Sequence, residues 1–306
     1  MTGATRSKRL GRAGLWLALL TTTAAQAQES APDKLNVSYA VDGAIVTAAV
    51  LGTVLVTWIP VDRSVRWQRH LLPFDKRLEG CTSASAARTS DILAVLDVMM
   101  PLGLMLGQQG MTEDNGKRML VYGESVAVSL FFNGVIKYLV GRPRPYVYND
   151  DPRVQVYAER EGKDSHLSFY SGHASTTFTA SVAGAYLFAQ ATTDKKARAT
   201  VWGFELALAG ATASLRTRAG KHFYSDVIVG SLVGAAVGFA VPRLHGGPKV
   251  DLSAAEWVTI GSAPVVGAII GQLLPARADT LEPLSAAVML PWVTQRGGGL
   301  MLASVF

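Results

Sequence analysis

A histidine and an aspartate four residues apart are the first candidates for chemistry in this sequence. His222 and Asp226 stand at the start of a predicted apolar helix. Residues at this spacing lie on one helical face, so the carboxylate is expected to accept the Nδ1 proton of the imidazole. Nε2 would then be available as a nucleophile. The pair alone favours only a structural hydrogen bond, because this spacing often occurs by chance.

Three basic residues can bring positive charge to that histidine. Arg216 lies near the end of the preceding predicted helix, and Lys137 and Arg144 lie seven residues apart where another helix ends. The glycine and prolines within residues 141–145 should break this helix and fold Arg144 back near its end. Taken alone, a lysine and an arginine at a helix end more often form a solvated C-terminal cap than a ligand site.

A third cluster, Ser171, Gly172 and His173, directly precedes a long apolar segment. Serine is a favoured N-cap and glycine lets a ligand approach the backbone, so the free amides of the first turn can bind an anion such as phosphate. The alternative is an ordinary cap followed by a surface histidine. This cluster alone does not decide between the two.

The order of the three clusters is more specific than any one of them. Between residues 137 and 226 the chain carries Lys-x6-Arg-Pro, then Ser-Gly-His, then Arg-x5-His-x3-Asp. This order resembles the three-part signature of the type 2 phosphatidic acid phosphatase superfamily, which includes bacterial acid phosphatases and vanadium haloperoxidases. The resemblance covers roughly residues 39–243. Tyr170 stands where the family usually has proline, and Leu215 where a serine usually precedes the arginine.

The resemblance implies a role for each residue of the three clusters. Five of them would bind the phosphoryl group: Lys137, Arg144, Ser171, Gly172 and Arg216. His222 would attack phosphorus to give a phosphohistidine, Asp226 would orient it, and His173 would protonate the leaving alkoxide. Three cations and a helix N-terminus can stabilise phosphoryl transfer without a metal. The sequence shows no metal-ligand spacing, and we expect neither a metal nor another cofactor.

Composition and charge narrow the class of protein. The chain has 306 residues, 49% apolar and 17% charged, which excludes a disordered polymer, a collagen and a disulfide miniprotein. Its single cysteine, Cys81, excludes an intrachain disulfide. Residues 1–27 combine a basic start, an apolar stretch and an Ala-Gln-Ala site, which predicts a secretory signal. Without them 25 basic residues face 23 acidic ones, so nothing favours a nucleic-acid partner.

Six apolar segments of helical length predict an all-α, six-helix bundle, which the resemblance identifies as the acid phosphatase/vanadium haloperoxidase type. They span residues 39–59, 91–109, 118–140, 171–191, 200–218 and 223–243. Several carry acidic or basic residues, which are costly in lipid unless they face a bundle interior. Composition therefore leaves open how many helices cross a membrane. We expect residues 28–248 to form the phosphatase domain.

The C-terminal part of the chain has a different character. Residues 249–306 are expected to form an extension whose last two apolar runs, around a glycine-rich turn, predict a β-hairpin. Residues 257–274 fit either a seventh helix or two strands. The resemblance does not reach this extension.

The function that fits best is a metal-independent phosphatase of the bacterial cell envelope, acting on a phosphate monoester or diphosphate. We expect the substrate to be a lipid, such as a phosphatidate or an isoprenyl diphosphate. We expect membrane association with a periplasm-facing site; a soluble periplasmic or outer-membrane location stays open. No protein partner is inferred. A vanadate-dependent haloperoxidase is the second hypothesis, and a non-catalytic envelope protein with structural cations is the third.

Overall fold

The protein is described here from a computed structural model, which covers residues 35–61, 72–247, 249–275, 286–294 and 297–305. The predicted secretory signal, residues 1–27, lies outside the described residues.

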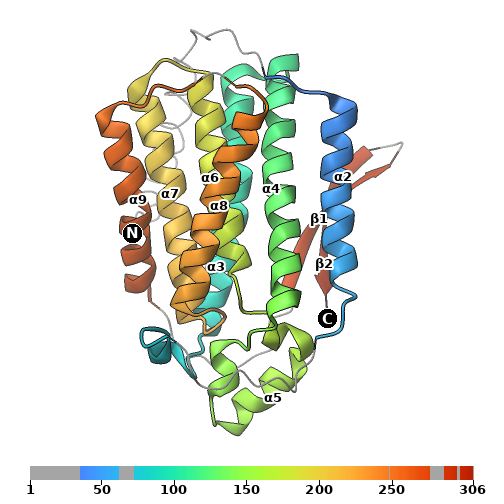
Figure 1. The fold of residues 1–306 in the computed structure, drawn as a ribbon, viewed down its shortest axis with the longest axis vertical. Coiled ribbons are helices and arrows are strands. Elements are labelled where there is room, and N and C mark those ends of the chain that lie inside the picture. The colour runs from blue at the N-terminus through green and yellow to red at the C-terminus, as the bar shows by residue number, and fades with distance from the viewer. Residues whose placement is uncertain (1–34, 62–71, 248, 276–285, 295–296, 306) are drawn as a thin grey trace, which may run out of the picture.

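Long helices lie side by side in the described part of the chain (Figure 1). They are α2 (Tyr39–Val56), α3 (Ala84–Gln109), α4 (Glu113–Val140), α6 (Gly172–Gln190), α7 (Lys195–Arg218), α8 (Tyr224–Leu244) and α9 (Ala254–Leu273). The first six fall on the six predicted apolar segments. The helix α6 contacts α3, α4, α7 and α8, and most of its residues are buried. The core of the bundle is therefore built around α6.

A seventh long helix corrects the expected count of six. The backbones of α7 and α9 touch: a Cβ on Gly210 would lie 2.1 Å from the carbonyl oxygen of Pro264. Arg198 Nε of α7 donates to Glu256 Oε1 of α9 at 2.7 Å, and Arg218 donates to the carbonyl of Leu274 just beyond α9. The extension predicted from residue 249 thus begins with a helix that packs on the bundle, a contact that apolar periodicity could not reveal.

A stripe of three glycines brings α8 against α6. A Cβ added at Gly230, Gly234 or Gly238 would lie 2.2–2.6 Å from a carbonyl oxygen of the segment Ser171–Thr179. Only glycine permits so close an approach of two helices. Because α8 starts just after His222 and α6 starts just before His173, this stripe holds the two predicted catalytic histidines at the same end of the bundle.

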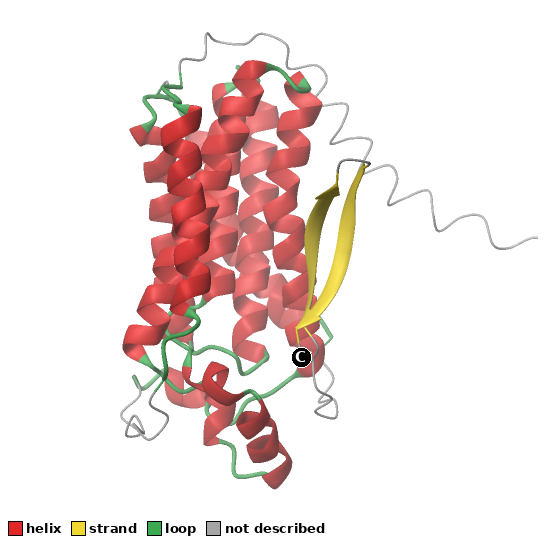
Figure 2. Ribbon diagram, turned by 90° about the vertical axis from the view of Figure 1, so that its right-hand side faces the viewer, coloured by secondary structure: helices red, strands yellow, loops and turns green. Residues whose placement is uncertain are grey.

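The segment between α4 and α6 covers that end. It contains the 3-10 helix η2 (Pro145–Tyr148), the short helix α5 (Pro152–Arg160) and the 3-10 helix η3 (Gly162–His166). In Figure 1 this segment lies below the bundle, and Figure 2 shows the same placement from the side. A further 3-10 helix, η1 (Asp75–Leu78), leads into α3.

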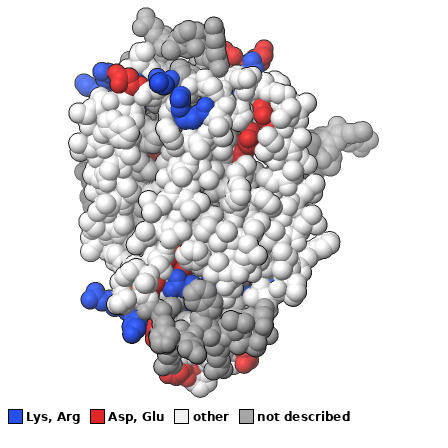
Figure 3. All heavy atoms as spheres, in the orientation of Figure 1, with Lys and Arg blue, Asp and Glu red and all other residues white. Residues whose placement is uncertain are grey.

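The outer wall of the bundle is apolar. On the face drawn in Figure 3, charged side chains gather near the two ends and the wall between them is largely uncharged. Large apolar side chains are exposed on several of the helices, among them Leu51, Ile92 and Val258. By length and composition, α2, α3, α4, α8 and α9 could each cross a membrane. These features support membrane association.

The described C-terminal residues form β1 (Ala286–Thr294) and β2 (Gly297–Val305). The two strands pair antiparallel, with Ala286 opposite Val305 and Thr294 opposite Gly297. Figure 2 shows this two-stranded sheet in yellow.

Candidate active site

The eight predicted site residues come from three neighbouring helix ends. α4 ends at Gly141, whose left-handed conformation (φ +58°) turns the chain back towards the bundle. α6 begins at Gly172, and the turn from α7 to α8 carries His222. His222 is close enough to feel the positive charges of Lys137, Arg144 and Arg216. His173 also interacts electrostatically with it. The structure therefore gathers residues that are up to 89 positions apart in the sequence, from Lys137 to Asp226, at one end of the bundle.

His222 is held as a neutral imidazole with one nitrogen occupied. Its Nδ1 lies 2.8 Å from the carbonyl oxygen of Ser168, which can only accept a hydrogen bond. Nδ1 must therefore carry the proton, and Nε2 keeps its lone pair. The side chain is only 1% exposed. Burial, followed by the charges of Arg144 and Lys137, lowers the pKa of His222 well below its usual value. The neutral form is the one a nucleophile requires.

The expected hydrogen bond between His222 and Asp226 is not formed. Asp226 Oδ2 lies 3.9 Å from His222 Nδ1, because its carboxylate is taken up by other donors. Arg142 Nη1 and Ser168 Oγ each lie 2.5 Å from an oxygen of Asp226, and the N–H of Phe223 donates to it at 2.9 Å. Asp226 thus caps α8 and holds the Ser168 segment, whose carbonyl orients His222.

Two arginines keep donors that no group in the described part of the chain uses. Arg144 binds Asp164 through Nη2 at 2.7 Å, yet its buried Nη1 has no hydrogen-bond partner. Arg216 donates through Nη1 to Ser90 and Asp91, while its buried Nε has none. Unsatisfied buried donors on a cation are costly. An anion in this site would satisfy both.

Lys137 lies against the start of α6. A Cβ on Gly172 would lie 3.5 Å from Lys137 Nζ and 2.7 Å from Asn133 Oδ1. Asn133 in turn donates to the carbonyl of Tyr170 at 2.9 Å, which fixes the approach of α4. Glycine at position 172 therefore makes room for the side chain of Asn133, and the ammonium of Lys137 lies within van der Waals contact of the same position.

The first turn of α6 has the form of an anion site. Ser171 is its N-cap: its hydroxyl accepts a hydrogen bond from the N–H of Ala174 at 3.3 Å. The N–H of Ser171 is used by the carbonyl of Asp226 at 3.0 Å. Gly172 follows as the first helical residue. The positive end of the helix dipole adds to the charges of the nearby cations.

His173 is paired with a residue that the sequence analysis missed. Its Nε2 lies 2.8 Å from Oδ1 of Asp91, the same oxygen that accepts from Arg216 at 2.9 Å. Burial and the charge of Arg216 lower the pKa of His173 to about 4, although Asp91 opposes this shift. The imidazole is neutral at pH 7 in the free protein, and a bound anion would favour its protonation.

Other residues that the sequence analysis did not assign to the site support it. Arg142 bridges Asp226 and Asp75, at 2.5 and 3.0 Å. Lys221, next to His222, binds Glu161 at 3.0 Å, and burial together with the charge of Arg144 lowers the pKa of Lys221 to about 8. The arginine-proline-arginine sequence could have indicated that Arg142 belongs to the site, because it adjoins Arg144. The roles of Asp75, Lys221 and Glu161 are visible only in the tertiary contacts.

Two comparisons show what this chain is similar to. The family model described as the PAP2 superfamily matches residues 118–248, which hold all eight predicted site residues. Among solved structures, the chain is similar to one titled as the first transmembrane PAP2 type phosphatidylglycerolphosphate phosphatase from Bacillus subtilis, with 20% identity and a TM-score of 0.39 over 76% of this chain and 94% of that one.

Proposed function

We propose that the protein is a phosphatase that hydrolyses a phosphate monoester or diphosphate of a lipid through a phosphohistidine at His222. The observation that carries the proposal is the convergence of three cations on a buried, neutral His222. Lys137, Arg144 and Arg216 all act on it, and two of their buried nitrogens have no hydrogen-bond partner among the described residues. A tetrahedral anion offers acceptors for such nitrogens.

The first half-reaction follows from the tautomer of His222. Nε2 attacks phosphorus while the bond from phosphorus to the ester oxygen breaks. The leaving oxygen takes a proton from His173, which the bound phosphate dianion has charged. The new positive charge on His222 is stabilised by the Ser168 carbonyl and by Asp226 at 3.9 Å. The cations neutralise the equatorial oxygens in the transition state.

The second half-reaction releases the enzyme. Water attacks phosphorus, His173 accepts its proton, and the bond from phosphorus to Nε2 breaks to give inorganic phosphate. Asp91 lies 2.8 Å from His173 and can stabilise the imidazolium that forms. Atoms and charges balance without a metal or another cofactor.

A lipid substrate is supported by the position of the site on the molecule. The site lies at one end of a bundle whose outer helices expose large apolar side chains. A phosphate headgroup at a membrane surface can reach such a site while its acyl or isoprenyl chain stays in lipid. The leader predicted in residues 1–27 supports export to the cell envelope, with the site facing the periplasm.

Phosphate release by the full chain in detergent, after treatment with EDTA, tests the proposal. We expect turnover of phosphatidate or of an isoprenyl diphosphate to exceed turnover of a soluble aryl phosphate. A quench in alkaline denaturant should trap an alkali-stable, acid-labile phosphoryl adduct in the wild type and none in His222→Ala. Equal phosphate release by the two proteins would contradict the mechanism. Retained vanadate binding by the variant shows that it is folded.

A further inference from the structure

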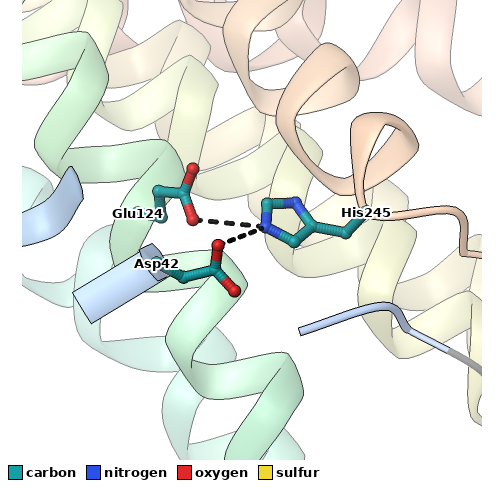
Figure 4. Close-up of side chains that lie close together, drawn as sticks. All are labelled: Asp42, Glu124 and His245. Carbon is teal, nitrogen blue, oxygen red and sulfur yellow. Dashed lines mark ion pairs between the residues drawn. The ribbon is translucent and has the colours of Figure 1, made fainter. Parts of the chain in front are cut away.

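Two carboxylates and a histidine converge at the other end of the bundle, outside the phosphate site. His245 Nε2 lies 3.5 Å from Asp42 Oδ1 and 3.3 Å from Glu124 Oε2. Figure 4 shows the imidazole directed at both carboxylates. The three ligand atoms all lie within 4.8 Å of one another. Asp42 and Glu124 are each 6% exposed and His245 is 9% exposed.

This cluster is far from the catalytic histidines. His222 lies two residues before the start of α8, whereas His245 directly follows its last residue. Because α8 has 21 residues, the two histidines are separated by about 30 Å along its axis. The phosphoryl chemistry proposed above therefore makes no use of Asp42, Glu124 or His245.

The hydrogen bond of His245 to the backbone determines which ring nitrogen faces the two carboxylates. Its Nδ1 lies 2.9 Å from the carbonyl of Val241, so Nδ1 carries a proton and Nε2 of the neutral ring offers only a lone pair. Glu124 Oε2, which faces that nitrogen, is buried and receives no hydrogen bond from the described residues. With a neutral ring, three lone pairs face one another, and either a proton on Nε2 or a metal ion between them would remove the repulsion.

Charge balance favours a divalent cation over a proton. Among the described residues, the charges that act on Glu124 are those of His245 and Asp42. A second proton on His245 would leave the cluster with a net charge of −1 inside an apolar bundle. A divalent cation bound to a neutral imidazole and two carboxylates brings the sum to zero, which removes most of the cost of burying these groups.

We propose that Asp42, Glu124 and His245 bind a divalent transition metal, with zinc as the best match. In a tetrahedral zinc site, nitrogen and oxygen ligands about 2.0–2.2 Å from the metal lie about 3.4 Å from each other. The two observed separations, 3.3 and 3.5 Å, agree with that edge. Magnesium and calcium prefer six or more oxygen ligands, so a histidine ligand disfavours them.

The surroundings of the three ligands have the features of a built metal site. The carbonyl of Val241 fixes the ring of His245, and the N–H of Ser38 donates to Asp42 Oδ2 at 2.8 Å, which leaves Oδ1 for the metal. Such outer contacts orient metal ligands. The ligands come from α2, α4 and the end of α8, so a bound ion would join three separate segments of the chain.

Cobalt binding to the full chain in detergent is the direct test. After removal of metals with EDTA and desalting, the wild type should bind one equivalent of Co²⁺ with the intense visible absorption of tetrahedral cobalt. One equivalent of Zn²⁺ should abolish that absorption, and Mg²⁺ should not. Zn²⁺ should also raise the melting temperature, because it binds the folded state. This measurement needs no variant.

Variants then assign the site to its residues. Glu124→Gln and His245→Asn should each weaken cobalt binding by more than the roughly 10- to 100-fold lost when an outer contact is removed. Glu113→Gln, which alters an exposed glutamate on the same helix, should bind as the wild type does. A wild type without tetrahedral cobalt absorption, or variants that keep it, would overturn the proposal. A melting temperature that responds to pH but not to zinc would also overturn it, and would indicate that a proton, not a metal ion, lies between the three side chains.

Discussion

Oδ1 of Asp91 lies 2.8 Å from Nε2 of His173, the histidine expected to protonate the leaving group. The same oxygen accepts a hydrogen bond from Arg216, so a carboxylate already contacts two groups proposed to serve the phosphate. The side chain of Asp91 is 50% exposed, whereas that of His173 is 33% exposed and that of Arg216 is 6% exposed. Asp91 therefore competes with an incoming anion and also favours the protonated form of His173.

Replacing Asp91 with asparagine separates these two effects. In Asp91→Asn, loss of the negative charge should strengthen inhibition by vanadate about three- to tenfold, in line with a partly exposed charge pair. Turnover should fall, because His173 loses the carboxylate that stabilises its charged form. Steady-state kcat together with the vanadate inhibition constant measures both. A variant with weaker vanadate inhibition would show that Asp91 does not oppose the anion.

Arg144 and Arg216 should each contribute strongly to anion binding. Both are buried and each has a nitrogen without a partner, so an anion can gain a charge-assisted hydrogen bond from each. Arg144→Gln or Arg216→Gln should weaken vanadate inhibition by about 10- to 150-fold, equivalent to about 1.5–3 kcal/mol. Arg153→Gln is the matched control, since Arg153 is exposed and pairs only locally with Asp151. Equal losses in the control would point to a general effect of surface charge.

Anion affinity should rise as the pH falls. In the free protein the pKa of His173 is about 4, and a bound dianion raises that pKa by favouring the imidazolium. Binding therefore takes up a proton, and affinity increases from neutral pH down to about 4, below which the free histidine is already charged. Lys221, with its pKa lowered to about 8, loses its charge above that value and weakens binding further.

Sulfate binding measured by calorimetry checks this dependence, because the charge of sulfate is constant over the range. We expect proton uptake when the heats are compared in buffers of different ionisation enthalpy. Affinity that is independent of pH between 5 and 8 would mean that no histidine is coupled to the anion. His173→Gln should remove the dependence below neutral pH and leave the part due to Lys221.

The close contact between α6 and α8 should tolerate no added methyl group at its centre. In Gly234→Ala, the new Cβ would lie 2.2 Å from the carbonyl oxygen of Ser175, so the helices must move apart. We expect a loss of about 1–3 kcal/mol in stability and reduced turnover, since this contact holds His173 near His222. Gly123→Ala, where a Cβ meets nothing within 4 Å, is the control. Thermal melting in detergent compares the two, and equal melting temperatures would contradict the role given to the stripe.

The positions of six helices, two of their ends and the candidate site residues could be predicted from local sequence patterns. Helical periodicity located six helices, and the serine before α6 and the glycine after α4 marked helix ends correctly, because capping depends on one or two neighbouring residues. The order of the three clusters indicated the superfamily whose model matches residues 118–248, and it supplied all eight candidate site residues. Spacing alone also suggested that His222 and Asp226 are neighbours, and they are 3.9 Å apart.

The tertiary structure decided which polar groups are hydrogen-bond or ion-pair partners. Ser168, not Asp226, accepts the proton of His222 Nδ1, and Asp91 reaches Arg216 across 125 positions of the chain. α9 joined the bundle through its contact with α7, and Asp42, Glu124 and His245 met at the end away from the phosphate site. A buried polar group takes whichever partner the packing brings within about 3 Å. Local sequence fixes where a helix starts and ends, whereas these partners depend on how the helices pack.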